Sequence, residues 1–135
     1  MSKEIRWKQR YSNFQKALFQ LQDAVGKETY SALEMQGLIQ CFEYTIELAW
    51  KTLQDIIHAK GYPEINGPRP VLRKAFAEGY ITDDEGWLTM WDDRLTTSHS
   101  YDEMAALQIV TNIKEKYFLL FAALHQRLET EPDIF

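Results

Sequence analysis

The stretch from Ser31 to Ile57 restricts the fold most, because it contains no proline and repeats apolar residues at the spacing of an amphipathic helix. Ser31 and Glu34 have the spacing of a capping box, in which each side chain accepts a hydrogen bond from the other residue's backbone N–H. At 1.5 Å per residue this helix would be roughly 40 Å long and would form the spine of the fold. Its apolar positions are Met35, Leu38, Ile39, Phe42, Ile46, Ala49, Trp50, Leu53, Ile56 and Ile57.

Helical spacing also appears on both sides of this spine. The segments Thr82-Asp-Asp-Glu85 and Ser100-Tyr-Asp-Glu103 both have the pattern of a capping box and mark the starts of two later helices. No segment shows the strict alternation of a β-strand or the turn signals of a hairpin. The sequence therefore predicts an all-α protein with one domain over residues 1–135, folded as an antiparallel four- to five-helix up-and-down bundle. The helices expected besides the spine cover residues 7–25, 70–78, 82 to about 95, and 100 to about 129.

Charge and composition exclude several classes of protein. The chain has 15 Lys and Arg residues against 20 Asp and Glu residues, a net charge of −5, which argues against a protein that coats nucleic acid through charge alone. The single Cys41 cannot form an internal disulfide. No run approaches the roughly 18 apolar residues of a membrane span, and the first residues lack the apolar region of a secretion signal. We therefore expect a cytoplasmic protein with no membrane partner.

Polar residues crowd between Asp92 and Glu103, at the predicted junction of two helices. On an unbroken helix Arg94 and His99 would lie roughly 140° apart, so only a break in the helix can bring them together. With Ser100 as the N-cap, Tyr101 would be the first helical residue. The exposed N–H groups at this helix start would then favour an anion such as a phosphate.

Arg94 and His99 have the chemistry needed at an RNA phosphodiester. His99 can take or give a proton near neutral pH, at the 2′-hydroxyl or at the leaving oxygen. Arg94 can stabilise the charge that develops on the phosphorus centre. This route needs no metal ion and no cofactor. In the plainer interpretation, His99 only packs before the helix start and Arg94 pairs with a neighbouring carboxylate, namely Asp92, Asp93 or Glu103.

Segments along most of the chain resemble the nucleotidyltransferase substrate-binding protein family. They are Phe42-Glu-Tyr-Thr-Ile-Glu-Leu-Ala-Trp-Lys51, Pro70-Val-Leu-Arg-Lys-Ala-Phe76 and the segment from Trp91 to Glu103. Within the last one, Arg94 to Tyr101 matches the Arg-x4-His-x-Tyr motif of HEPN-domain ribonucleases. The resemblance implies a HEPN-like homodimer, similar to the helical domain of aminoglycoside nucleotidyltransferases and encoded beside a minimal nucleotidyltransferase (MNT).

Two functions compete for such a protein. In the first, the resemblance implies the toxin of a toxin–antitoxin pair: a metal-independent endoribonuclease with Arg94 and His99 as catalytic residues. The MNT chain would then be the antitoxin, and it would silence the toxin by transferring AMP to Tyr101. In the second, the chain is a non-catalytic substrate-binding subunit that holds an acceptor for the nucleotidyltransferase.

Other charged residues have smaller expected roles. Because an acidic dimer repels RNA, basic residues should gather near the motif, and the candidates are Arg69, Arg73 and Lys74. Glu43 and Glu47 stand one turn apart, a spacing seen in carboxylate metal sites, but no Glu-x-x-His accompanies them. An ion pair from Glu47 to Lys51 explains them more simply, and no metal site is expected.

Overall fold

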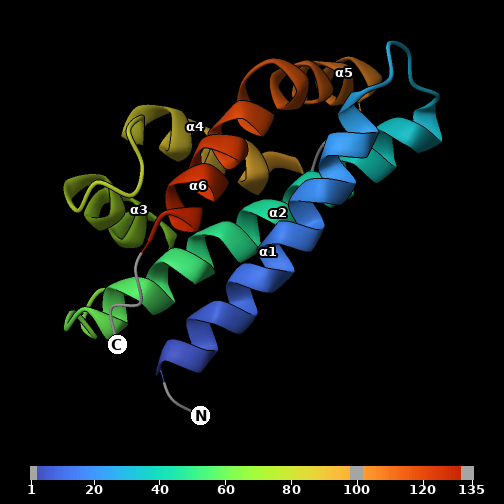
Figure 1. The fold of residues 1–135 in the computed structure, drawn as a ribbon. Helices are drawn as coiled ribbons and strands as arrows, with labels where there is room; N and C mark the ends of the chain where they lie inside the picture. Colours follow the sequence, from blue (N-terminus) through green and yellow to red (C-terminus); the bar gives the residue numbers. More distant parts are fainter. Residues whose placement is uncertain (1–2, 98–101, 132–135) are drawn as a thin grey trace.

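Two long antiparallel helices, α1 (Lys3–Val25) and α2 (Ala32–Ala59), pack along each other and form the base of the molecule (Figure 1). The computed structural model describes the backbone of residues 3–97 and 102–131 and the side chains from Arg6 onward within these ranges. In this part of the chain every regular element is a helix. The remaining helices pack on one side of the α1–α2 pair (Figure 1).

The start of α2 follows the sequence prediction. The backbone N–H of Glu34 donates to Oγ of Ser31 at 3.1 Å, and the N–H of Ser31 donates to Oε1 of Glu34 at 2.9 Å. From this cap α2 continues for 28 residues, about 42 Å. The spine is therefore confirmed, and each later helix has part of its buried face against it.

The shorter helices α3 (Pro68–Ala77) and α4 (Asp84–Thr97) follow the turn rich in proline and glycine after α2. α3 begins two residues earlier than predicted, because a proline is tolerated in the first turn, where its missing N–H has no helical partner. The start of α4 also differs from the prediction. The N–H of Gly86 donates to Oδ1 of Asp83 at 2.9 Å, so Asp83 caps this helix and the prediction of Thr82 is wrong.

The last helical rod has three segments: α5 (Glu103–Asn112), the π-helical turn η1 (Ile113–Tyr117) and α6 (Phe118–Glu129). The carboxylate of Asp102 accepts the N–H of Met104 at 3.1 Å and caps α5. Ser100 and Tyr101, predicted as the cap and the first residue of this helix, lie outside the described residues, and Asp102 is a good cap directly after them. The π-helical turn shifts the register of the rod without breaking it.

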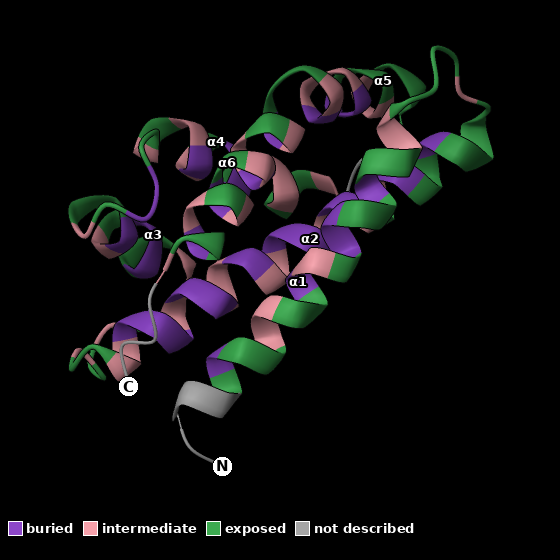
Figure 2. Ribbon diagram, in the orientation of Figure 1, coloured by how far each residue is buried: buried purple, intermediate pink, exposed green. Residues whose placement is uncertain are grey.

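Phe121 of α6 lies at the centre of the core and contacts aromatic rings from three other helices. Its ring centroid is 6.3 Å from Phe14, 6.2 Å from Phe42 and 5.7 Å from Trp87. Figure 2 shows the buried faces of the helices turned toward one another. With the last rod counted once, the described residues form five helices, and the predicted all-α bundle is confirmed. No helix in these residues is both long and apolar enough to cross a membrane.

Candidate functional site

Arg94 lies in the last turn of α4, and its side chain meets two carboxylates of α2. Its Nη1 is 3.2 Å from Oε2 of Glu43, and its Nε is 3.7 Å from Oε1 of Glu47. Glu43 and Glu47 are one turn apart and share a face of α2, so both reach the same guanidinium. All three side chains are about one-quarter exposed, so water screens their attraction only in part.

Neighbouring side chains hold this ion pair in place. The hydroxyl of Thr97 lies within hydrogen-bond distance of Oε2 of Glu43 and of the Arg94 carbonyl oxygen, the latter at 2.7 Å. The indole N–H of Trp50 donates to Oε2 of Glu47 at 3.1 Å, and the Trp50 ring packs edge-on against Trp91 of α4. The end of α4 is therefore tied to α2 by both polar and aromatic contacts.

The plainer interpretation of Arg94, an ion pair with a carboxylate nearby in the sequence, is wrong. Asp92 pairs instead with Arg69 of α3. Asp93 accepts a hydrogen bond from the Tyr117 hydroxyl and another from Nδ2 of Asn112. Burial raises the pKa of the Tyr117 hydroxyl above its ordinary value, and the hydrogen bond and charge of Asp93 add to this rise. These contacts fasten α4 to α3 and to the last rod, and they leave Arg94 directed toward α2.

The partners of Arg94, Glu43 and Glu47, are candidate site residues that the sequence did not link to it. The sequence suggests Glu43 and Glu47 only as metal ligands or as a partner for Lys51, and the latter contact does exist at 3.8 Å. Two carboxylates one turn apart on a mostly apolar helix need a cation, and this signal could have suggested Arg94. Within the residues that the structure describes, no group of three or more His, Cys, Asp or Glu residues could hold a metal ion.

A cleft of about 600 Å³ opens beside this ion pair, between the first half of α2 and the start of α5. The predicted site residues His99 and Tyr101 fall in 98–101, outside the described residues. Thr97 and Asp102 flank that segment, and both line the cleft. The described residues on either side of 98–101 therefore both lie at the cleft wall. The lining residues are Ala32, Met35, Gln36, Ile39, Gln40, Glu43, Thr97, Asp102, Glu103 and Ala106.

The charge of this cleft differs from what the sequence suggested. Glu43, Asp102 and Glu103 place three carboxylates on its wall. Because Asp102 caps α5, its negative charge already occupies the helix start that was expected to bind an anion. A phosphate here would therefore depend on Arg94, which stands beside the cleft and is shared with the carboxylates of α2.

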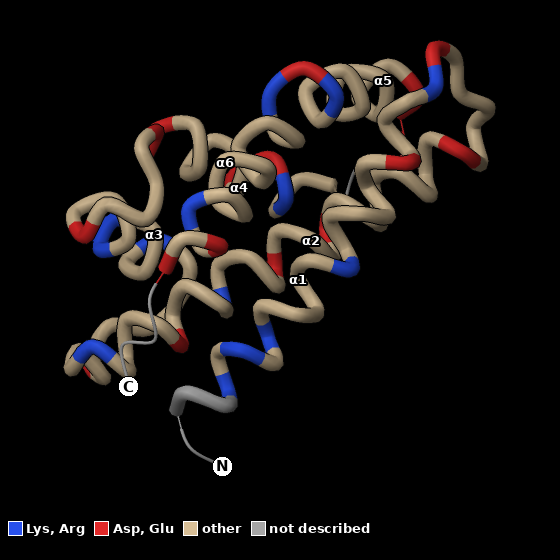
Figure 3. The backbone as a smooth tube through the Cα atoms, in the orientation of Figure 1, with Lys and Arg blue, Asp and Glu red and all other residues tan. Residues whose placement is uncertain are grey.

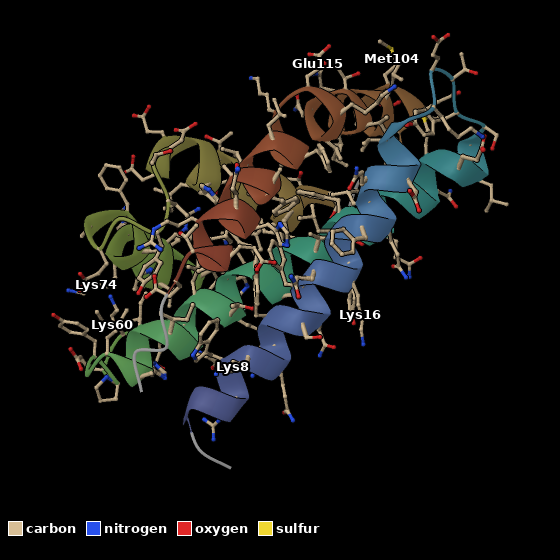
Figure 4. The ribbon with its side chains drawn as sticks, in the orientation of Figure 1. Lys8, Lys16, Lys60, Lys74, Met104 and Glu115 are labelled. Atoms are coloured by element: carbon tan, nitrogen blue, oxygen red, sulfur yellow. The ribbon has the colours of Figure 1, made fainter. Side chains whose placement is uncertain are left out.

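The three basic residues proposed for RNA binding lie on α3, and none of them lines the cleft. Arg69 is bonded to Asp92, and Arg73 is exposed. Lys74 pairs with Glu78 at 3.5 Å. In Figure 4 Lys74 lies beside Lys60, at the end of the molecule away from Met104 on α5. The structure therefore does not gather these residues around the motif.

These features define a class of protein: an all-α bundle in which the end of α4 and the start of α5 border a cleft on α2. Residues 9–130 match the family described as nucleotidyltransferase substrate binding protein like. The match covers most of the chain and includes the cleft, and the protein belongs to this family.

Known proteins similar to this chain agree with that assignment. A probable ribonuclease HepT from Haemophilus influenzae is 31% identical over 102 residues, which are 72% of this chain and 66% of that protein. This chain thus spans just under two-thirds of the length of that curated relative. A crystal structure of a protein from Thermus thermophilus is 34% identical with a TM-score of 0.79, covering 85% of this chain and 98% of the other.

A more distant solved structure shares the fold. It comes from Haemophilus influenzae and is described as revealing the fold of a substrate binding domain of a nucleotidyltransferase. It is 22% identical to this chain with a TM-score of 0.69, and the match covers 94% of this chain and 99% of the other.

Proposed function

We propose that this protein is the HEPN-type toxin partner of a minimal nucleotidyltransferase and that it cleaves RNA without a metal ion. Arg94 and His99 are the catalytic pair of this proposal. The observation that carries it is the position of Arg94, which is partly exposed beside the cleft. Thr97 and Asp102, on either side of residues 98–101, both line this cleft. The similarity to a probable ribonuclease HepT supports the same activity.

The proposed reaction is an internal transfer of the phosphate ester. The 2′-oxygen attacks phosphorus, the bond from phosphorus to the 5′-oxygen breaks, and the products are a 2′,3′-cyclic phosphate and a 5′-hydroxyl. His99 takes the proton of the 2′-hydroxyl or gives a proton to the leaving 5′-oxygen, and the second of these two transfers goes through water or the other His99 of the proposed homodimer. Arg94 stabilises the negative charge that gathers on the phosphorus centre, and Glu43 and Glu47 hold its guanidinium in position. In the proposed homodimer two Arg94/His99 pairs face each other.

The proposed partner silences this site by adenylylation of Tyr101. The Tyr101 hydroxyl attacks the α-phosphorus of ATP bound by the MNT chain, and pyrophosphate leaves. The adenylate adds bulk and negative charge two residues from His99, where an RNA phosphate has to bind. With MNT and ATP, the wild type should gain the mass of one AMP and Tyr101→Phe should gain none. Equal labelling of both proteins would remove this part of the proposal.

A specific observation favours a second candidate function, a non-catalytic substrate-binding subunit of a two-chain nucleotidyltransferase. Three carboxylates, those of Glu43, Asp102 and Glu103, line the cleft, and such a wall attracts a cationic acceptor more than a phosphate. In that case the partner carries out the chemistry and His99 neither makes nor breaks a bond.

The two functions are separated by incubating the purified, unmodified protein in EDTA with a single-stranded RNA and with the same strand made of DNA. The proposed nuclease cuts only the RNA, because DNA lacks the attacking 2′-hydroxyl, and mass spectrometry should find the cyclic phosphate. An intact RNA strand with folded protein would favour the substrate-binding subunit. Cleavage of both strands would contradict the proposed chemistry.

A further inference from the structure

Basic side chains concentrate on the first half of α1, although the chain as a whole is acidic. Residues 3–16 contain five of the 15 Lys and Arg residues and one of the 20 Asp and Glu residues. Figure 3 shows blue segments along the described part of the first half of α1. This concentration lies outside the site already described, and neither the motif nor the α3 residues explain it.

Part of this basic surface borders a hollow between α1 and α2. The hollow has a volume of about 530 Å³ and is lined by Arg6, Gln9, Arg10 and Asn13 of α1 and Leu48 of α2. Lys16 and Gln20 continue the same stripe, because steps of three or four residues return to one face of a helix. The stripe extends for about 21 Å and contains only side chains that donate N–H groups. Its members are Arg6, Gln9, Arg10, Asn13, Lys16 and Gln20.

A second hollow continues along α1 and adds an aromatic ring. Its volume is about 330 Å³, and Gln20 lines it together with Gly37, Gln40, Cys41 and Tyr44 of α2. The Tyr44 side chain is 56% exposed, so a face of its ring is accessible. We call the two hollows and the donor stripe beside them the α1–α2 groove.

The charges of this groove differ in how firmly they are held. Arg10 is bound to the buried carboxylate of Asp55, with its Nε 3.1 Å from Oδ2. Arg6 and Lys16 are exposed, and Figure 4 shows Lys16 extending outward from α1. The groove thus has a fixed cation at one position and two accessible cations beside it.

The α1–α2 groove adjoins the candidate active site. Gln40 lines both the second hollow and the cleft beside Arg94, so the two depressions meet at this side chain. The cleft itself contains three carboxylates and would hold a polyanion poorly. The groove supplies the positive charges that the cleft wall lacks.

We propose that the α1–α2 groove binds single-stranded RNA and leads the strand to the cleft beside Arg94. Arg6, Arg10 and Lys16 contact its phosphates, and Tyr44 stacks on a base. A donor-lined groove beside an exposed aromatic ring is the usual arrangement for binding a single strand with little sequence preference. A duplex keeps its base faces stacked and cannot use Tyr44 in this way. The inference rests on the proposed function, because it takes the bound RNA to be the strand that is cleaved.

Binding is tested with a fluorescent 20-nucleotide single-stranded RNA and proteins that carry His99→Ala, so that cleavage does not interfere. Fluorescence anisotropy over a range of salt concentrations gives the affinity and its salt dependence. Three forms are compared in this background: Arg6→Gln with Lys16→Gln, Tyr44→Leu, and Lys116→Gln. Lys116 is an exposed lysine of η1 away from the groove, and it controls for the loss of one positive charge elsewhere on the protein.

In the variant with Arg6→Gln and Lys16→Gln, the loss of two phosphate contacts should reduce the slope of log affinity against log salt by about 1.4, at roughly 0.7 per contact for a single strand. Tyr44→Leu should weaken binding by at least about fivefold with little change of slope, and Lys116→Gln should match the parent. An affinity and slope in the groove variants equal to those of Lys116→Gln would overturn the proposal. A changed oligomeric state in light scattering would also overturn it, by showing that the groove is an interface between copies.

The same variants, made without His99→Ala, separate this inference from the proposed function. If the wild type cleaves RNA and the groove variants cleave it with an unchanged kcat/KM, the groove proposal fails and the nuclease stands. If the groove variants lose affinity but the wild type leaves RNA intact, the groove stands and the nuclease fails.

Discussion

Replacing Arg94 by alanine should destabilise the fold as well as remove a group of the proposed catalytic pair. One guanidinium meets Glu43 at 3.2 Å and Glu47 at 3.7 Å, and all three side chains are about one-quarter exposed. A hydrogen bond between charged groups contributes roughly 1.5–3 kcal/mol, whereas an exposed ion pair contributes about 0.2–1 kcal/mol. We therefore expect Arg94→Ala to lower the free energy of unfolding by about 1–2 kcal/mol, since Glu43 and Glu47 lose their shared guanidinium and repel each other. For a chain of this size that corresponds to roughly 3–8 °C in Tm.

A double-mutant cycle with Glu43→Gln measures this contact directly. Once Arg94 is absent, neutralising Glu43 relieves the repulsion from Glu47, so the second change should cost less in Arg94→Ala than in the wild type. We expect a coupling energy of about 1 kcal/mol from urea unfolding followed by far-ultraviolet circular dichroism. Additive effects, within about 0.3 kcal/mol, would refute the inferred ion pair. The loss of stability measured for Arg94→Ala also limits the temperature at which its activity can be compared with that of the folded wild type.

Two further predictions concern the core and the tyrosines. Phe121→Ala should lower the free energy of unfolding by about 3–5 kcal/mol, because it leaves a cavity among three aromatic rings, whereas Leu119→Ala, at a side chain 62% exposed, should change it by less than about 0.5 kcal/mol. Equal losses in urea unfolding would contradict the central position of Phe121. Burial raises the pKa of the hydroxyls of Tyr11, Tyr80 and Tyr117 above their ordinary 10.0. Above pH 10 these tyrosines therefore ionise readily only in the unfolded chain. The free energy of unfolding should hold below pH 10 and fall as pH rises above it. The free energy of unfolding of Tyr117→Phe, measured by urea titration at a series of pH values, should fall less steeply with pH than that of the wild type. Identical slopes would contradict the raised pKa of Tyr117.

The helices of this protein could be predicted because each has a strong local pattern. Ser31 and Glu34 form the capping box that their spacing indicates, and α2 continues from it without a break. The starts of α4 and α5 differ from the prediction where several good cap residues stand together, and α1 begins four residues before the predicted start at Trp7. Asp83 caps α4 in place of Thr82, and Asp102, which was expected inside the helix, caps α5, because the choice among adjacent caps depends on how the helix packs. The π-helical turn at 113–117 depends on packing in the same way.

The site was predictable in part for a similar reason. The motif residues lie close together in the sequence, so Arg94 could be singled out from composition and spacing. Its partners Glu43 and Glu47 lie about fifty residues earlier on another helix, and only the packing of α4 against α2 shows that one guanidinium serves both. The acidic wall of the cleft was not predicted. With a cap at Ser100, Asp102 would lie inside the helix, whereas in the structure it caps α5 and lines the cleft.

The most direct test of the account is the rate of RNA cleavage in EDTA for the wild type, Arg94→Ala and His99→Ala, each confirmed as unmodified at Tyr101 and measured at a temperature where all three are folded. The account predicts that the wild type cleaves and that each variant loses activity by at least about 100-fold, the scale on which general acid–base and charge-stabilising groups act. Wild-type rates in both variants would contradict it and assign the cleavage to other residues or to a contaminant.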